Sequence, residues 1–229
     1  MQKIKSISEY FFLICKIFLF KLKIFYFKSN FYNNKISNNL PTKFSYKPSL
    51  HIINSLTSFN KKKIKIESYT LNSLWKLSSK NKSEFQNLHN FLWLTLLDIK
   101  TNKTSAQTII ENWIDNNNDF DEETWKLDIL SKRLIAWISN SNLTTEETSP
   151  KYKEKFILSI TKQANHLSIN IDSSEDYENK LICCSSLILV GLTFKNKINI
   201  TNQVYRYFKN LLKIILMIQD FQNLEIPKN

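Results

Sequence analysis

The chain has 229 residues, of which 42% are apolar and 13% aromatic, so it is long enough to bury one sizeable core. A single glycine, Gly191, excludes phosphate-cradling loops and dinucleotide-binding folds, because these need several glycines where the backbone approaches the ligand. Three cysteines, of which Cys183 and Cys184 are adjacent, cannot form a disulfide framework or a cysteine-rich zinc site. We interpret the adjacent pair as small core residues and expect neither a metal nor a cofactor.

The net charge of +12 is concentrated at the N-terminal end of the chain. Residues 1–65 contain thirteen lysines and one acid, Glu9, whereas residues 66–229 contain nineteen basic and nineteen acidic residues. The front segment has no arginine, although proteins that read bases usually place arginine together with lysine on one face. The charge pattern therefore argues against nucleic acid as a partner, and favours contact with acidic glycans or an anionic membrane surface.

Residues 10–27 form an apolar, aromatic stretch that is interrupted by Lys16, Lys21 and Lys23. These charges argue against a transmembrane helix, which needs about twenty residues with few or no charges. Lys16 also splits the apolar region that a signal peptide requires, and no small-residue cleavage site follows it. We expect the apolar side of this segment to pack on the body of the protein; the alternative is a peripheral position on an anionic membrane. These features are compatible with a cytoplasmic protein and with a membrane-associated one.

Proline positions and apolar periodicity divide the chain into two parts. Pro41 and Pro48 bracket an Asn-rich connector, so residues 1–65 are predicted to form a basic helix followed by a less regular connector. Residues 66–229 are predicted to form a helical domain that becomes regular near residue 84, with Ser149 and Pro150 starting one helix. Apolar residues recur at helical spacing within 109–114, 127–138 and 152–171, and two more helices are predicted at 175–193 and 199–222. Short connections predict antiparallel neighbours, so the fold class is all-α, an irregular or incomplete α/α toroid-like array of helical hairpins.

Four of the five tryptophans lie between residues 88 and 137, where one of only two arginines, Arg133, precedes Trp137 by four residues. The segments that form this pattern are Leu88-His89-Asn90-Phe91-Leu92-Trp93-Leu94, Trp113-Ile114, Trp125, Arg133-Leu134-Ile135-Ala136-Trp137 and Gln163-Ala164-Asn165-His166-Leu167. In order and spacing they resemble the N-terminal helical domain of the heparinase II/III-like family of polysaccharide lyases, over roughly residues 70–225. The basic start of the chain is also similar to that family's N-terminal region.

The resemblance implies a role in β-elimination at a uronic acid of an acidic polysaccharide. In that reaction a base removes the proton next to the carboxylate, a cation or amide stabilises the enolate, and an acid protonates the leaving oxygen. A substrate groove lined by six side chains follows from the resemblance, with the two tryptophans as platforms for sugar rings. These side chains are His89, Asn90, Trp93, Arg133, Trp137 and His166. Structural roles remain the alternative, because tryptophans among apolar neighbours usually belong to a core and histidines are more often structural than catalytic.

The sequence also departs from the family's pattern. Full-length members continue into a β-sandwich domain that this sequence does not contain, and their helical part usually has a loop with glycine and histidine followed by an Arg-Asn pair. Between Gly191 and Tyr207 no such loop is found. We therefore expect the chain to be incomplete and inactive alone, with a separate β-sandwich domain or chain as one partner. A non-catalytic module for acidic glycan or an anionic membrane, and a purely structural remnant, are the alternatives.

Overall fold

The computed structural model describes residues 2–38, 75, 82–96, 103–174 and 176–194. All regular elements in these ranges are helical, which confirms the predicted all-α class, while a toroid-like arrangement remains a prediction. The elements are α1 (Gln2–Phe27), α2 (Asn30–Ser37), α5 (Lys82–His89), η2 (Leu92–Leu96), α6 (Lys103–Asn117), α7 (Leu127–Ser139), α8 (Ser141–Thr144), α9 (Pro150–Asn170), η3 (Ile171–Ser173) and α10 (Tyr177–Thr193), of which η2 and η3 are 3-10 helices. The expected Asn-rich connector and the helix at 199–222 lie outside the described residues.

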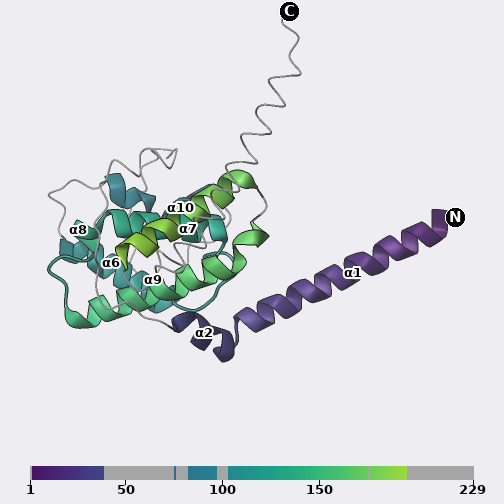
Figure 1. Cartoon of the computed structure of the whole chain (residues 1–229), viewed down its shortest axis with the longest axis horizontal. Coiled ribbons are helices and arrows are strands. Elements are labelled where there is room, and N and C mark those ends of the chain that lie inside the picture. The colour runs from purple at the N-terminus through teal and green to yellow at the C-terminus, as the bar shows by residue number, and fades with distance from the viewer. Residues whose placement is uncertain (1, 39–74, 76–81, 97–102, 175, 195–229) are drawn as a thin grey trace, which may run out of the picture.

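Helix α7 is the central element of the body. It contacts α5, η2, α8, α9 and α10, and ten of its thirteen residues are buried. Figure 1 shows α7 beside α9 and α10. A helix that is apolar on most of its surface is stable only where neighbours cover it on most sides. The Arg133-to-Trp137 motif belongs to this helix, so the motif lies in the core.

Two helices begin at side-chain caps, of which the start at Ser149 and Pro150 was predicted from the sequence. The hydroxyl of Ser149 accepts a hydrogen bond from the backbone N–H of Tyr152 at 3.2 Å, and Pro150 occupies the first turn of α9. At α10 the carboxylate of Asp176 accepts from the backbone N–H of Asn179 at 2.6 Å. These caps fix where both helices start, and Cys183 and Cys184 within α10 are fully buried, as expected of core residues.

The chain makes a tight turn between α5 and η2 without using glycine. Phe91 takes a φ of 57° in the left-handed region, and the side-chain oxygen of Asn90 accepts a hydrogen bond from the N–H of Leu92 at 2.9 Å. The turn places the Phe91 ring against Trp113 and Trp137, with ring centroids 5.8 and 5.3 Å away. Packing of these rings offsets the conformational strain at Phe91.

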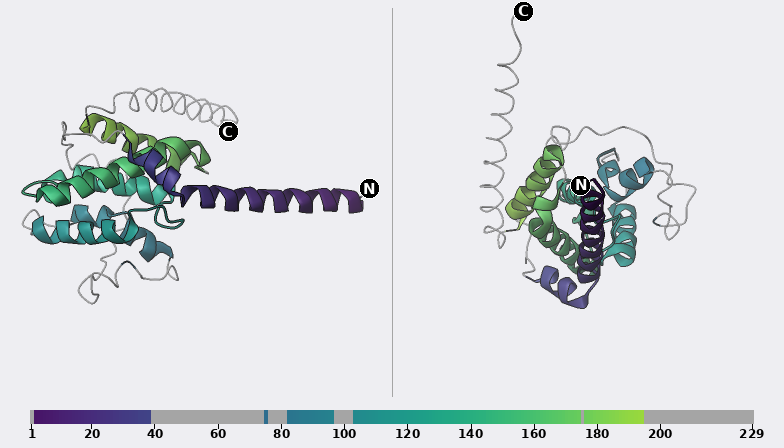
Figure 2. Two further views of the ribbon diagram at one scale, coloured as in Figure 1. Left: turned by 90° about the horizontal axis from the view of Figure 1, so that it is seen from below. Right: turned by 90° about the vertical axis from the view of Figure 1, so that its right-hand side faces the viewer.

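Helix α1, the predicted basic N-terminal helix, projects away from the body (Figures 1 and 2). Ile24 and Phe27 near its end are partly buried, whereas from Glu9 to Lys23 every side chain except Cys15 is exposed. The expectation that its apolar side packs on the body is therefore wrong for most of the helix. No helix in the described part of the chain is long and apolar enough to cross a membrane.

Helix α2 is regular structure within the segment that was expected to be less regular. It packs on α9, where Tyr32 and Ile36 are buried and the side-chain amide of Asn165 donates to the carbonyl of Ile36 at 2.6 Å. Ser29 caps its first turn by accepting from the N–H of Tyr32. Residues 30–37 are thus part of the body, and they bring Tyr32 beside His166.

Candidate functional site

All six side chains that were expected to line a groove are buried, each at most 5% exposed. Five of them lie in the core around α7, and one, His166, lies on α9 at the wall of a cavity. The five core residues are His89, Asn90, Trp93, Arg133 and Trp137. The structure thus separates His166 from the rest of the predicted set.

Arg133 connects three segments of the core by hydrogen bonds. Its Nε donates to Oε1 of Gln163 at 2.7 Å, and Nη1 donates to the carbonyl oxygens of His89 at 2.9 Å and Thr124 at 3.1 Å. Burial lowers its pKa to about 9, so the guanidinium stays charged at neutral pH. These contacts give Arg133 a structural role in joining α5, the segment before α7, and α9.

The Leu88-to-Leu94 motif makes its hydrogen bonds within the core. The indole N–H of Trp113 donates to Nδ1 of His89 at 3.0 Å, so the hydrogen of the neutral imidazole is on Nε2. Burial, and secondly the charge of Arg133, lower the pKa of His89 to about 3. The indole N–H of Trp93 donates to the carbonyl of Leu88 at 3.2 Å. These internal partners favour the structural interpretation of the motif over substrate contact.

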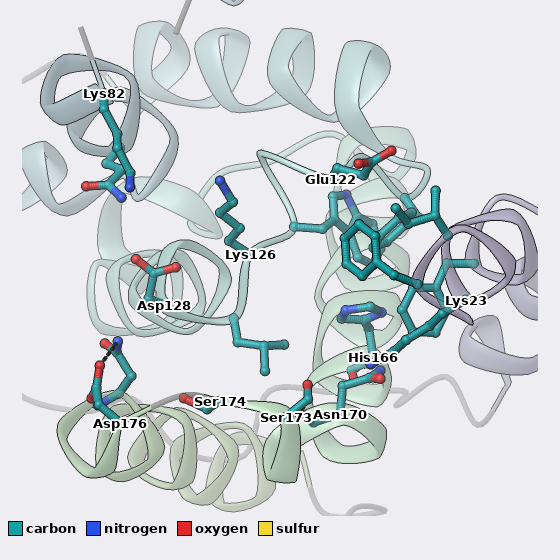
Figure 3. A pocket seen from close by; sticks show the side chains of 18 residues that line it. Lys23, Lys82, Glu122, Lys126, Asp128, His166, Asn170, Ser173, Ser174 and Asp176 are labelled. Atoms are coloured by element: carbon teal, nitrogen blue, oxygen red, sulfur yellow. Dashed lines mark hydrogen bonds between the residues drawn. The ribbon is translucent and has the colours of Figure 1, made fainter. Parts of the chain in front are cut away.

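A cavity of about 490 Å³ lies where α1, α5, the segment before α7, the end of α9 and the start of α10 meet. Figure 3 shows it, with Lys23, Glu122, His166 and Asn170 on one side and Lys82, Asp128 and Asp176 on the other. Its innermost wall is aromatic. The ring centroids of Phe27, Phe120 and Trp125 lie 5.3, 5.4 and 5.3 Å from that of His166.

A chain of hydrogen bonds fixes the orientation of His166. Asn170 donates its side-chain N–H to the oxygen of Tyr32 at 3.2 Å, and the Tyr32 hydroxyl is hydrogen-bonded to Nδ1 of His166 over 2.8 Å. Burial raises the pKa of Tyr32 to about 12, so its hydroxyl is protonated at neutral pH. Burial, with a smaller effect of Lys23, lowers the pKa of His166 to about 3. His166 is therefore neutral near pH 7 and is able to form one further hydrogen bond at the cavity wall.

Charged groups of both signs surround the aromatic wall. The lysines are Lys23, Lys82 and Lys126, and the acids are Glu122, Asp128 and Asp176. Glu122 is paired with Lys28 at 3.2 Å, and Asp176 accepts the capping bonds of α10. In the described part of the chain, Lys23 and Lys82 have no carboxylate partner. Two cations are thus available to a ligand that enters the cavity.

Sequence reasoning identified only His166 among the residues of this cavity. Asn170 follows His166 by four residues and so lies on the same face of α9, a spacing that indicates the pair. Phe120 stands just after the Asn-rich break at residues 116–118, which marks a turn but gives no sign of a cavity. Lys23 is more than 140 positions away from His166, so only the fold brings the two together.

The described residues contain no group of three or more His, Cys, Asp or Glu side chains that is arranged to hold a metal ion. Polar groups that suit an organic ligand are present instead, as amide, hydroxyl and ammonium groups around aromatic rings. Comparison of the chain with protein-family models, with curated proteins and with solved structures gives no match.

Proposed function

We propose that this chain is a helical domain that binds acidic carbohydrate, as the helical half of a heparinase II/III-like polysaccharide lyase, and that it does not carry out β-elimination alone. The observation that carries the proposal is the cavity between α1, α9 and α10, which is lined by an aromatic wall and by two lysines that have no carboxylate partner among the described residues, Lys23 on the side of His166 and Lys82 across from it (Figure 3). The sequence motifs given above and the all-helical body support the same interpretation.

The lining of the cavity matches the chemistry of a uronate-containing sugar. The C–H face of a pyranose packs on aromatic rings, for which the partly exposed Phe120 is available. Amide groups of Gln86 and Asn179 are able to bond sugar hydroxyls, and ammonium groups of Lys23 and Lys82 are able to bond a carboxylate. The volume of about 490 Å³ falls within the range of about 300–1,000 Å³ that is typical of small-ligand sites.

The protonation states favour binding over proton transfer. A general base works best when its pKa is near the working pH. The pKa of His166 is lowered to about 3, which makes it a weak base, and the pKa of Tyr32 is raised to about 12, which keeps it protonated. We therefore assign His166 the role of a neutral hydrogen-bonding partner of bound sugar.

The proposal is tested by calorimetric titration of the full chain with uronate oligosaccharides and with neutral oligosaccharides of equal length. We expect the acidic ligands to bind, and Lys82→Gln and Phe120→Ala each to weaken binding by at least about tenfold, because each removes a charged or stacking contact. Lys151→Gln is the matched control, since it removes an exposed lysine of α9 that is not part of the cavity wall. Equal binding of acidic and neutral ligands, or no effect of Lys82→Gln, contradicts the proposal.

A further inference from the structure

We propose that α1 binds the surface of an anionic membrane, lying in the plane of the headgroups with one apolar face turned into the lipid. The proposal concerns the outer side of α1 and is independent of carbohydrate binding in the cavity. Two features of the helix indicate an anionic lipid surface as the partner. They are its exposed apolar surface and its excess of positive charge.

The first feature is the amount of apolar surface that α1 leaves exposed. Eleven large apolar side chains between Tyr10 and Phe25 are 48% to 77% exposed. Figure 2 shows the helix extending from the body as a single rod. Contiguous apolar patches of this kind mark sites of protein or membrane contact, because monomeric soluble proteins rarely expose them.

The position of the cavity shows which side of α1 faces outward. Phe20, Ile24 and Phe27 line the cavity, so this side of the helix is turned toward the body. At about 100° per residue, the opposite side has an arc of roughly 160° without a charged residue. The residues of this outer face are Phe11, Phe12, Ile14, Cys15, Phe18, Leu19, Leu22, Phe25 and Tyr26.

Lysines border the outer face on both edges. Lys16 lies at one edge and Lys21 at the other. Lys23 lines the cavity, and Lys28, just beyond the end of α1, is paired with Glu122, so neither is counted toward the lipid. A lysine at such an edge extends its ammonium group to the lipid phosphates while the apolar face enters the acyl region. Lys16 and Lys21 therefore set the depth and orientation of the helix in the interface.

Charge distinguishes a membrane from a second copy of this chain as the occupant. Glu9 is the only acid among the first 65 residues, so two copies of α1 would bring lysines together without acids to pair with them. Anionic lipid supplies the missing negative charge, and each lysine near such a surface adds favourable energy. Lys16, Lys21 and Lys23 are also too many for a bilayer span, in agreement with the absence of a spanning helix among the described residues.

Binding is measured by co-sedimentation of the full chain with vesicles of phosphatidylcholine, with and without phosphatidylglycerol. Cys15 provides a probe of insertion, because the same helical geometry places it within the outer face, whereas Cys183 and Cys184 are fully buried. Burial also raises the pKa of Cys183 to about 12, which slows its labelling. We expect sedimentation with the anionic vesicles, and a blue shift of a polarity-sensitive dye on Cys15 when they are added.

Two sets of substitutions separate the contributions of apolar surface and charge. Replacing Phe11, Phe18 and Phe25 together with serine is expected to reduce partitioning to anionic vesicles at least tenfold, because the triple variant loses three of the four phenylalanines of the outer face. Lys16→Gln with Lys21→Gln is expected to reduce it about tenfold or more. The matched control, Lys151→Gln with Lys153→Gln, makes the same change of net charge at exposed positions of α9 and is expected to bind as the unmodified chain does.

The outcomes that overturn the proposal are distinct from one another. Equal binding to both kinds of vesicle, or binding to neither, refutes recognition of an anionic surface. A dimer in sedimentation velocity without lipid, lost in the triple serine variant, shows that α1 binds a second copy instead. Circular dichroism and thermal unfolding establish that each variant is folded. Uronate binding by the triple serine variant is expected to be unchanged, so failure of the membrane proposal and failure of the carbohydrate proposal are seen separately.

Discussion

The guanidinium carbon of Arg133 lies 4.1 Å from the ring centre of Trp113, and both side chains are completely buried. The hydrogen bonds of the guanidinium go to three neutral oxygens, on Gln163, His89 and Thr124. No carboxylate pairs with Arg133 among the described residues. An aromatic face and neutral acceptors therefore stabilise a buried charge where a counter-ion is usual.

This arrangement predicts a large loss of stability when Arg133 is truncated. Arg133→Ala removes the donors of three buried acceptors and leaves a void beside Trp113. We expect it to lower the free energy of unfolding by about 3–5 kcal/mol, measured by urea denaturation. Lys132→Ala, on the same helix but partly exposed, is the control and is expected to change that energy by less than about 0.5 kcal/mol. An Arg133→Ala protein of unchanged stability that had lost uronate binding would favour the substrate role expected from the sequence.

The two buried histidines predict a loss of stability in mild acid. The pKa values of His89 and His166 are both lowered to about 3, against about 6.5 in the unfolded chain. Between these pH values the unfolded state binds more protons, so stability is fully present above about pH 6.5 and decreases as the pH falls. Well below pH 6.5 each histidine contributes a slope of about 1.4 kcal/mol per pH unit.

Urea denaturation at several pH values between 5 and 7 measures this slope. In that range most carboxylates stay ionised, so the histidines dominate the change. His166→Gln retains an acceptor for Tyr32 but does not titrate, and we expect it to reduce the slope to about half. An unchanged slope would show that His166 is protonated in the folded protein, contrary to its surroundings.

Local patterns in the sequence were sufficient to predict the interior of the body. Apolar spacing in α7, the Ser149-Pro150 start of α9 and the buried pair in α10 are all set by contacts within one helix, and the structure confirms them. The position of α1 was predicted incorrectly. A high apolar content indicates that a helix buries its side chains against some surface, but it does not identify that surface. Periodicity likewise identifies the apolar face of a helix and not the element or membrane that the face contacts.

The cavity was harder to predict than the helices for the same reason. The tryptophan and arginine motif is conspicuous because these residue types are rare in the chain, yet the hydrogen bonds of Trp93, Trp113 and Arg133 go to backbone carbonyls and to His89 inside the core. Nothing in the sequence around Phe120 or Lys82 indicates a cavity. The sequence pattern around a residue that lines a cavity is the same as the pattern around any other exposed or partly exposed residue. His166 was identified from the sequence because it belongs to a motif. Its hydrogen-bond partner Tyr32 is far away in the sequence, so only the folded structure identifies it.

Backbone strain at Glu147 gives a prediction with an internal control. Glu147 has a φ of 56°, and its exposed carboxylate pairs with Lys103 at 2.6 Å. Glu147→Ala and Glu147→Gly both remove this ion pair, but only glycine adopts the left-handed conformation without strain. After allowing for the greater freedom of glycine in the unfolded chain, we expect the glycine variant to be more stable by about 1 kcal/mol in thermal unfolding. Equal stability of the two variants would show that the turn relaxes when the glutamate is removed.

The final prediction is that the chain binds uronate polymers without cleaving them. Incubation with heparan-type and alginate-type polymers is expected to give no increase in the absorbance of unsaturated uronate, while an active lyase added to a parallel sample gives one. The reason is that His89 and Arg133 are enclosed in the core, whereas His166 at the cavity wall is too weak a base to remove the proton next to a carboxylate near neutral pH. Product formation that disappears in His166→Gln would overturn this and make His166 a catalytic residue; product formation that survives in His166→Gln would place the base elsewhere in the chain.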